Sequence, residues 1–181
     1  MTEVRADAVN RARELRCAFD QTFAEVPLPV TQDVTNLLGI RVGGDPFAIR
    51  LGEVAGLFAD RKIVPLPSPV PELLGVAGFR SGLIPIYSLR GFLGYPPASE
   101  IPPRWLILAG SGHLVGLAFD QFEVHLRVRR SELRKIQGGA SRAHIRETAS
   151  LAEGLRAIVS IDSVVETIKD RIGLVGTIEE K

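Results

Sequence analysis

The 181-residue sequence is poor in the side chains that most often hold metals or form cross-links. It has one cysteine, Cys17, and three histidines, His113, His125 and His144. A single cysteine cannot form an internal disulfide, and the three histidines lie too far apart to match any metal-ligand spacing. The sequence therefore excludes a disulfide framework, and we expect neither a metal ion nor a cofactor.

Long hydrophobic runs and an excess of one charge are also missing. The chain has 22 basic and 21 acidic residues, for a net charge of +1, and only 6% aromatic residues. These values disfavour nucleic-acid binding, which calls for a basic stripe or stacking aromatics. No stretch is apolar for long enough to span a bilayer, and the N-terminus does not read as a signal peptide. We therefore expect a cytoplasmic protein that does not insert into membranes.

Motifs for enzymatic chemistry are scarce as well. No serine lies in a G-x-S-x-G elbow, and the glycine pair at 43–44 is not followed by the lysine of a phosphate loop. Asp120 ends an apolar segment, and we interpret it as a turn or strand-end cap. An enzyme stays open as an alternative, and it would need a deep polar pocket containing His125 or Asp120 with shifted titration. The residues favour a binding module.

Helical periodicity marks the N-terminal segment. Over residues 4–25, apolar side chains recur every three or four positions, at Ala8, Ala12, Leu15, Phe19 and Phe23. Prolines in 26–30 end this helix. Such a face usually packs on its own domain, and the alternative is docking to a partner.

Short strand-like segments, separated by glycine and proline turns, occupy most of the remaining sequence. They cover residues 34–42, 46–51, 53–60, 75–79, 83–89, 104–110, 114–120, 122–129 and 155–162. The proline-rich segment 62–74 predicts an extended connection, 129–144 predicts polar and loop structure, and 163–172 predicts a short helix capped by Ser163 or Asp162.

This pattern predicts an all-β protein with short helices. Two strand-rich halves, divided near 95–103, indicate two small barrels that share a core. We expect three regions: an N-terminal helix and proline-containing linker at 1–33, the barrel domain at 34–172, and a C-terminal tail at 173–181.

The segment "GVAGFRSGLIPIYSLRGFLG", residues 75–94, is too apolar for a surface loop and too broken for a helix. Gly82 can adopt the positive φ of a tight turn between two strands. Pro85 predicts an edge strand or a bulge, because proline lacks a ladder donor. Gly94 closes a single helical turn.

This segment resembles the signature of the CheW-like family, the coupling proteins of bacterial chemotaxis arrays, approximately Gly-Val-x-Asn-Leu-Arg-Gly-x-x-x-Pro-Val-x-Asp-Leu-Arg. The residues in register are Gly75, Val76, Arg80, Pro85, Leu89 and Arg90. Further similarity to the family in "PFAIRLGEVAGL", "GLAFDQFEV" and "AIVSIDSVVETI" extends the resemblance over about 34–172.

The resemblance implies two SH3-like five-stranded β-barrels that share a core, and a non-enzymatic adaptor function. Family members tie the regulatory domain of a CheA-type histidine kinase to the cytoplasmic tips of methyl-accepting chemoreceptors. A diverged accessory protein that binds only one of these partners stays open as an alternative.

The resemblance also suggests roles for individual residues. Partner binding is expected of Val54, Leu57, Phe79, Arg80, Ser81 and Ser88. A structural role is expected of Gly75, Gly82, Pro85, Leu89 and Arg90. Arg80 could equally form an internal ion pair, and Val54 and Leu57 could belong to the core.

Three positions depart from the family pattern. Ser81 stands where the family has glycine, Ser88 where it has aspartate, and Gly56 where it has glutamate. The last two substitutions remove charges from a region expected to face partners.

Overall fold

A computed structural model describes residues 33–80, 82–97, 103–110, 114–136 and 143–178. These residues belong to one compact unit that begins at Asp33. The helix predicted for 4–25, together with Cys17, Ser81 and His113, lies outside the described residues.

The middle of the chain forms one six-stranded sheet, called sheet B here. Its strand order is β3-β7-β8-β6-β5-β4. The strands are β3 (Gly56–Ala59), β4 (Ile63–Val64), β5 (Leu73–Phe79), β6 (Gly82–Ser88), β7 (Trp105–Ala109) and β8 (Val115–Phe119).

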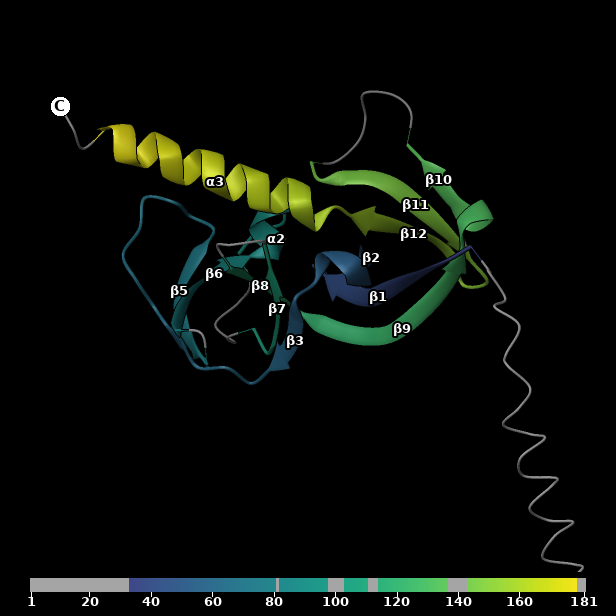
Figure 1. The fold of residues 1–181 in the computed structure, drawn as a ribbon, viewed down its shortest axis with the longest axis horizontal. Helices are drawn as coiled ribbons and strands as arrows, with labels where there is room; N and C mark the ends of the chain where they lie inside the picture. The colour runs from purple at the N-terminus through teal and green to yellow at the C-terminus, as the bar shows by residue number, and fades with distance from the viewer. Residues whose placement is uncertain (1–32, 81, 98–102, 111–113, 137–142, 179–181) are drawn as a thin grey trace, which may run out of the picture. The chain divides into compact units, whose positions relative to one another are not determined.

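The two ends of the described chain form the other six-stranded sheet, sheet A, with the order β10-β11-β12-β2-β1-β9. Its strands are β1 (Val34–Val42), β2 (Asp45–Arg50), β9 (Gln121–Arg129), β10 (Leu133–Lys135), β11 (Ile145–Leu151) and β12 (Gly154–Val159). Figure 1 shows the two curled sheets side by side.

Short helices join the strands, and one longer helix follows them. They are η1 (Leu51–Glu53), α2 (Leu89–Phe92), η2 (Arg130–Glu132) and α3 (Ile161–Ile178). Helix α3 leaves sheet A after β12 and runs across sheet B (Figure 1). It is longer than the helix predicted for 163–172, and its first turn is not capped by Ser163 or Asp162. Instead, the Ser160 hydroxyl accepts a hydrogen bond from the Ser163 N–H at 3.3 Å.

The predicted division of the strands near 95–103 is wrong. Sheet B includes strands from both sides of that segment, because β6 pairs with β8 in parallel. Sheet A joins distant segments in the same way, with β12 parallel to β2. Each sheet has six strands where five were expected. Strand β4 lies within the segment predicted as an extended connection, and strands β10 and β11 were missed because their residues are largely polar.

Pro85 does not lie in an edge strand, contrary to one of the two alternatives predicted for it. Strand β6 is an inner strand between β8 and β5. Pairing with β8 covers only Ile86 to Ser88, however, so Pro85 lies just beyond that ladder. Pro85 is opposite Val76 of β5 but opposite no residue of β8, so its missing N–H removes no hydrogen bond from the β6–β8 ladder.

The main core lies between the sheets and is shared by them. It includes Ile40 and Ile49 from sheet A, Ile107 and Leu117 from sheet B, and Ile168 from α3. Each sheet also encloses a smaller apolar cluster of its own. Strand β7 contributes to both kinds of core, since its alternate residues face opposite sides. The expected shared core is therefore confirmed.

Candidate protein-interaction site

The β5–β6 hairpin depends on two glycines with positive φ. Gly82, at the start of β6, has φ = 120°, as the sequence predicts. Gly75 has φ = 142°. A Cβ at Gly75 would overlap the Val64 carbonyl oxygen of the neighbouring strand β4. Only glycine fits both the conformation and the space at this position.

Arg80 follows β5 at the tip of this hairpin, and its side chain is exposed. No other described residue forms an ion pair with it, so the alternative of an internal ion pair has no partner within the described ranges. An exposed guanidinium on a hairpin with a fixed backbone is available to a carboxylate of another molecule.

An apolar surface lies beside Arg80 on the outside of sheet B, and sequence reasoning did not identify it. The register places Val64, Val76 and Pro85 in one row across three strands, with Leu83 opposite Gly78 in a neighbouring row. We call these five residues the β4–β6 face.

The alternation of burial shows that the β4–β6 face points outward. Ala77 and Ile84 point inward and are 1% and 4% exposed, whereas Leu83 is 75% and Val64 49% exposed. Residues that alternate with a buried row are on the opposite side of the sheet. The sequence alone does not show which apolar residues of β4, β5 and β6 face outward. The strand register shows it.

Phe79 is half-buried at the end of sheet B. Its ring meets Phe58 edge-to-face at 5.0 Å between centroids. The Arg61 guanidinium lies 5.3 Å from the centroid of each ring. These contacts give Phe79 a packing role.

Ser88 is half-buried, ends β6 and is the N-cap residue of α2. Its hydroxyl accepts a hydrogen bond from the Gly91 N–H at 3.3 Å, and its own N–H donates to the Glu72 carbonyl at 2.8 Å. Serine and aspartate are both favoured helix N-caps, because each offers an oxygen to the first-turn amides. The replacement of the family's aspartate by Ser88 therefore keeps a local structural role while removing the charge.

Arg90 joins the two sheets through Asp120. The Arg90 Nη1 donates to Asp120 Oδ2 at 3.0 Å, and the same oxygen accepts the Gly43 N–H at 2.6 Å. Arg90 Nε also donates to the Pro96 carbonyl at 2.6 Å. Asp120 thus ties the β1–β2 turn to the end of β8, which confirms its interpretation as a strand-end cap.

Val54 and Leu57 lie where the chain crosses from sheet A to sheet B. Both are half-buried and pack against the main core. Gly56 lies between them, and a Cβ there would meet the Phe58 ring.

Glu53, missed by sequence reasoning, caps α3 from a distant part of the chain. Its Oε2 accepts the Ile161 N–H at 2.6 Å, and Arg50 Nε lies 4.0 Å from its Oε1. Burial raises the pKa of Glu53, although the hydrogen bond from Ile161 opposes the shift. Glu53 thus holds the helix to the crossover between the sheets.

A second set of contacts ties α3 to α2 and to the residue before β5. Arg171 Nη1 lies 2.5 Å from Glu72 Oε1, and its guanidinium covers the Phe92 ring at 5.3 Å. His144 meets the same ring edge-to-face, and its Nδ1 is 3.1 Å from the Ser163 hydroxyl. Burial lowers the pKa of His144, with further lowering by Arg171 and Arg146.

Two polar hollows lie on sheet A. One, of about 310 Å³, is lined by residues that include Arg50, Arg130 and Glu147, and the other, of about 200 Å³, by residues that include Glu53 and Ser160. Neither contains His125 or Asp120, the residues on which the enzyme alternative depended.

Comparisons with known proteins agree with this architecture. The CheW-like domain family matches residues 36–169. Among curated proteins, the chain is similar to Protein PilI of Pseudomonas aeruginosa, with 31% identity over 102 residues. That alignment covers 52% of this chain and 55% of the relative, so the chain spans about half the length of the curated relative it matches.

Among solved structures, the chain is similar to the scaffolding protein TtCheW from Thermoanaerobacter tengcongensis. The TM-score is 0.62 at 14% identity, with 69% of this chain and 88% of that chain covered. This likeness confirms the expected fold of two barrel subdomains. None of the helices in the described ranges has the length and apolarity needed to cross a membrane.

Proposed function

The chain belongs to the CheW-like domain family, and from this premise we propose that it is a non-enzymatic adaptor that couples chemoreceptors to a CheA-type histidine kinase. The proposal places it in the cytoplasm, in a chemosensory signalling pathway. In this role the protein holds the receptor and the kinase in a fixed relative position, so that the state of the receptor changes the activity of the kinase.

The observation that carries the proposal is the apolar β4–β6 face. Leu83 is three-quarters exposed on a strand whose alternate residues are buried. An outward apolar row on a rigid sheet, with an exposed arginine at its end, has the composition of a protein-binding surface. We assign this face and Arg80 to the regulatory domain of the kinase.

The receptor tip is assigned to a different place, the crossover around Val54 and Leu57. Both side chains are half-buried, so a helical receptor hairpin would contact only their accessible parts. The two assigned surfaces use separate segments of the chain, and an adaptor needs such separation to bind both partners at once.

A diverged accessory protein that binds one partner is the second candidate. Gly56 and Ser88 favour it, since each lacks the acidic side chain of the family pattern near the assigned surfaces. Ser88 is a weaker argument than Gly56, because its hydroxyl still caps α2.

Titration calorimetry separates the two candidates. The purified full chain is titrated with the regulatory domain of the histidine kinase encoded beside it, and with a peptide hairpin of the neighbouring receptor tip. Binding of both supports the coupling function. Binding of one supports the accessory function, and binding of neither overturns both candidates.

A matched pair of variants tests the assigned face. Leu83→Gln on sheet B and Leu155→Gln on sheet A change leucines of similar exposure, 75% and 70%. We expect Leu83→Gln and Arg80→Ala each to weaken kinase-domain binding by about tenfold, or about 1.4 kcal/mol, with almost unchanged thermal melting. Leu155→Gln should change binding less than about twofold. Equal losses for both leucines would contradict the assignment.

A further inference from the structure

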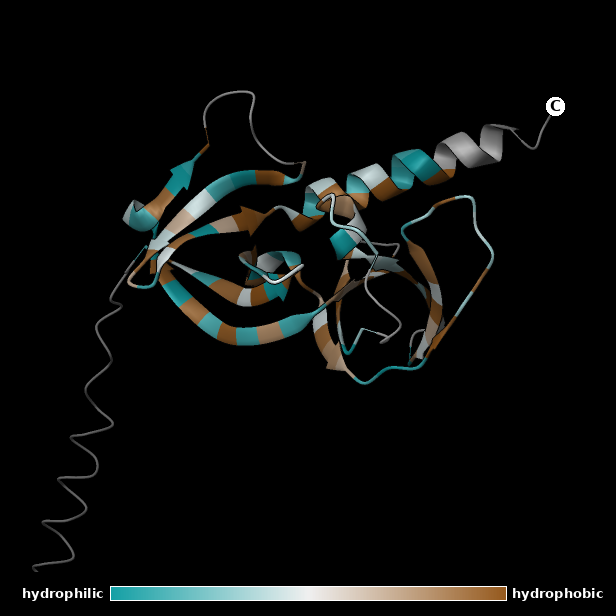
Figure 2. Cartoon of the chain, turned by 180° about the vertical axis from the view of Figure 1, so that it is seen from behind, coloured by the Kyte–Doolittle hydropathy of each residue, from teal (hydrophilic) through white to brown (hydrophobic). Residues whose placement is uncertain are grey.

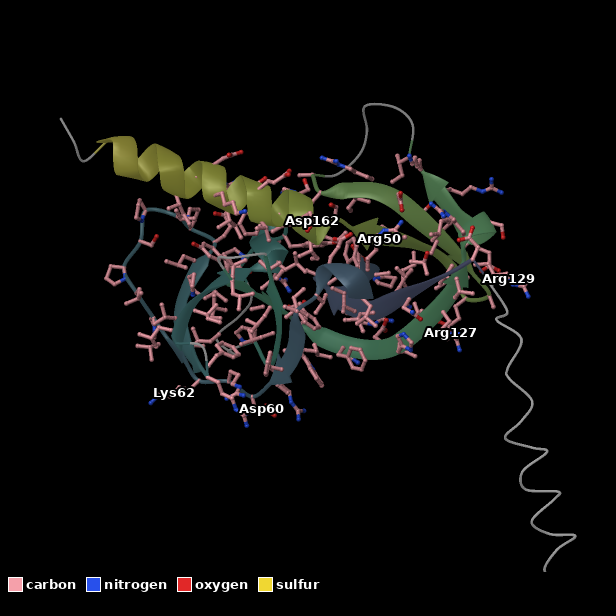
Figure 3. All side chains as sticks on the ribbon, viewed as in Figure 1. Arg50, Asp60, Lys62, Arg127, Arg129 and Asp162 are labelled. Atoms are coloured by element: carbon pink, nitrogen blue, oxygen red, sulfur yellow. The ribbon has the colours of Figure 1, made fainter. Side chains whose placement is uncertain are left out.

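Basic residues concentrate at one end of sheet A, although the whole chain has a net charge of only +1. Between positions 127 and 135 there is one acidic residue, Glu132, and the basic residues are Arg127, Arg129, Arg130, Arg134 and Lys135. This segment is more positive than the whole protein, so the remainder of the chain is net negative. Arg127 and Arg129 lie along β9, far from Lys62 on sheet B (Figure 3).

The charges along β9 are on one side of the strand. His125, Arg127 and Arg129 are exposed, whereas Leu126 is half-buried and Val128 is 1% exposed. Figure 2 shows the corresponding alternation of hydrophilic and hydrophobic residues along this strand. An extended backbone therefore presents the imidazole and the two guanidinium groups as one row.

Most of these charges are not neutralised within the described part of the chain. Arg130 pairs with Asp33, with 3.4 Å between Nη1 and Oδ1. Arg127, Arg129, Arg134 and Lys135 are exposed and form no ion pair with another described residue. The Glu132 carboxylate is already engaged, because it accepts the Arg129 backbone N–H at 2.9 Å.

Strand β9 is also the last strand of sheet A among those described. It pairs with β1 on one side only, so half of its backbone N–H and C=O groups point away from the sheet. The register shifts between Gly39 and Ile40 of β1, which leaves Glu123 as the extra residue of a bulge. Beyond that bulge, Val124 to Arg129 form a regular edge.

We propose that this edge of β9 binds an extended acidic segment of a partner protein, which adds to sheet A as a further strand. Backbone groups of the edge supply the pairing, and the row of Arg127 and Arg129 selects carboxylates on the facing side of the added strand. Arg134 and Lys135 belong to β10, the strand at the other end of the sheet A order, and they carry the positive charge beyond η2. This binding is separate from the kinase and receptor surfaces assigned above.

Edge protection and phosphate binding are two competing roles for the same arginines. Arginines can simply guard an exposed edge against pairing with a strand of any other protein. A phosphate polymer would be attracted by the same charges, but it has no amide groups to pair with the free backbone of β9. The combination of a free edge and an alternating basic row therefore favours a peptide.

The test uses the full chain and fluorescence anisotropy with labelled probes. One peptide alternates Glu and Thr over about twelve residues, long enough to span β9, and a second has the same composition in two blocks. Only the alternating peptide places all carboxylates on one side when extended. The third probe is a single-stranded oligonucleotide with the same number of charges.

We expect the alternating peptide to bind about tenfold more tightly than the block peptide and the oligonucleotide. The double variant Arg127→Gln/Arg129→Gln should lose about tenfold in this affinity, and Arg134→Gln/Lys135→Gln should lose less. Lys62→Gln/Lys169→Gln is the matched control, because it removes two exposed positive charges elsewhere and should change affinity less than about twofold.

Several outcomes would overturn the proposal. Equal binding of the alternating and block peptides would show that affinity depends only on the net charge of the peptide. Tighter binding of the oligonucleotide would assign the cluster to phosphates. An equal loss in the control variant, or no binding of any probe, would leave the arginines as guards of the edge. Circular dichroism of each variant checks that the fold is unchanged.

Discussion

Sheets A and B have the same number of strands but are built from different chemistry. Sheet B comes from one continuous stretch, and its inner strands β7 and β8 are almost uninterrupted apolar runs, because both of their faces are buried. Sheet A is assembled from segments at the two ends of the described chain, and it encloses a charged network.

That network centres on Glu123. Its carboxylate takes Arg41 Nε at 2.6 Å through one oxygen and Arg156 Nη1 at 2.7 Å through the other. Arg156 is 8% exposed and lies against Gly39, where a Cβ would meet its guanidinium. Shape and apolar packing specify sheet B, whereas sheet A adds a partly buried network of three charges that joins β9, β1 and β12.

The largest expected loss of stability comes from a substitution that disturbs the backbone of sheet B. Gly75→Ala should lower the free energy of unfolding by at least about 4 kcal/mol, because the new methyl group meets the Val64 carbonyl and the φ of 142° is strained for alanine. Urea denaturation measures the change.

Gly78, three positions further along β5, is the matched control for this substitution. A Cβ at Gly78 has no atom within 4 Å and its φ is not positive. Gly78→Ala should change stability by less than about 1 kcal/mol. Similar losses at both glycines would show that β5 tolerates no side chain at all, and that the approach of β4 is not the cause.

The next effect breaks sheet A through its charges. Glu123→Leu leaves the Arg156 guanidinium buried with only Glu153, 3.9 Å away and exposed, as a partner. We expect a loss of about 3 kcal/mol in unfolding free energy, which denaturant titration would detect.

A double variant shows whether the loss comes from the stranded charge. Glu123→Leu/Arg156→Met removes both charges and should recover stability to within about 1 kcal/mol of the unmodified chain. If the double variant is as unstable as Glu123→Leu alone, the ion pair does more than neutralise two buried charges. It would then also stabilise the β9 bulge.

Local sequence signals predicted sheet B better than sheet A. Glycine and proline turns delimit β5 and β6, and apolar runs mark β7 and β8, so these strands could be located from the sequence. Strands β10 and β11 are short or polar, with Arg134, Glu147 and Thr148 in them, and they form because β12 offers an edge to β11, which in turn pairs with β10. Pairings that join distant segments leave no such local pattern.

The site was predictable only in part for the same reason. The sequence located the glycines and Arg80 of the β5–β6 hairpin, since their turn signals are local. It could not separate Leu83 from Ile84, because only the strand register shows which of two adjacent apolar residues faces outward. It also missed Glu53, whose partner Ile161 lies in a distant part of the chain.

A smaller effect tests the cap at the end of β6. Ser88→Ala removes the acceptor of the Gly91 N–H and should cost about 1 kcal/mol, whereas Ser88→Asp should keep the wild-type stability. Thermal melting of the three proteins measures the difference. If Ser88→Asp is as unstable as Ser88→Ala, Ser88 contributes to stability because its small side chain fits the site, and not because its hydroxyl caps α2.

The smallest effect concerns Glu53, at the crossover between the sheets. Because burial raises its pKa above 4.5 in the folded state, the folded protein holds this proton more tightly than the unfolded chain does. The contribution of Glu53 to stability therefore falls as the pH rises from 4.5 through the raised value. Glu53→Gln keeps an acceptor for the Ile161 N–H without a charge, so its stability relative to the unmodified chain should increase over that interval.

His144 contributes to the pH dependence with the opposite sign. Its lowered pKa means that stability is lost as the pH falls below 6.5, the ordinary value for histidine. This contribution is present in both proteins and cancels in the difference between Glu53→Gln and the unmodified chain. Denaturant titrations from pH 4 to 8, with Glu166→Gln on the exposed side of α3 as the control, isolate Glu53. A pH-independent difference would mean that Glu53 is stabilised in its charged form by Arg50 and the start of α3 as fully as burial destabilises it.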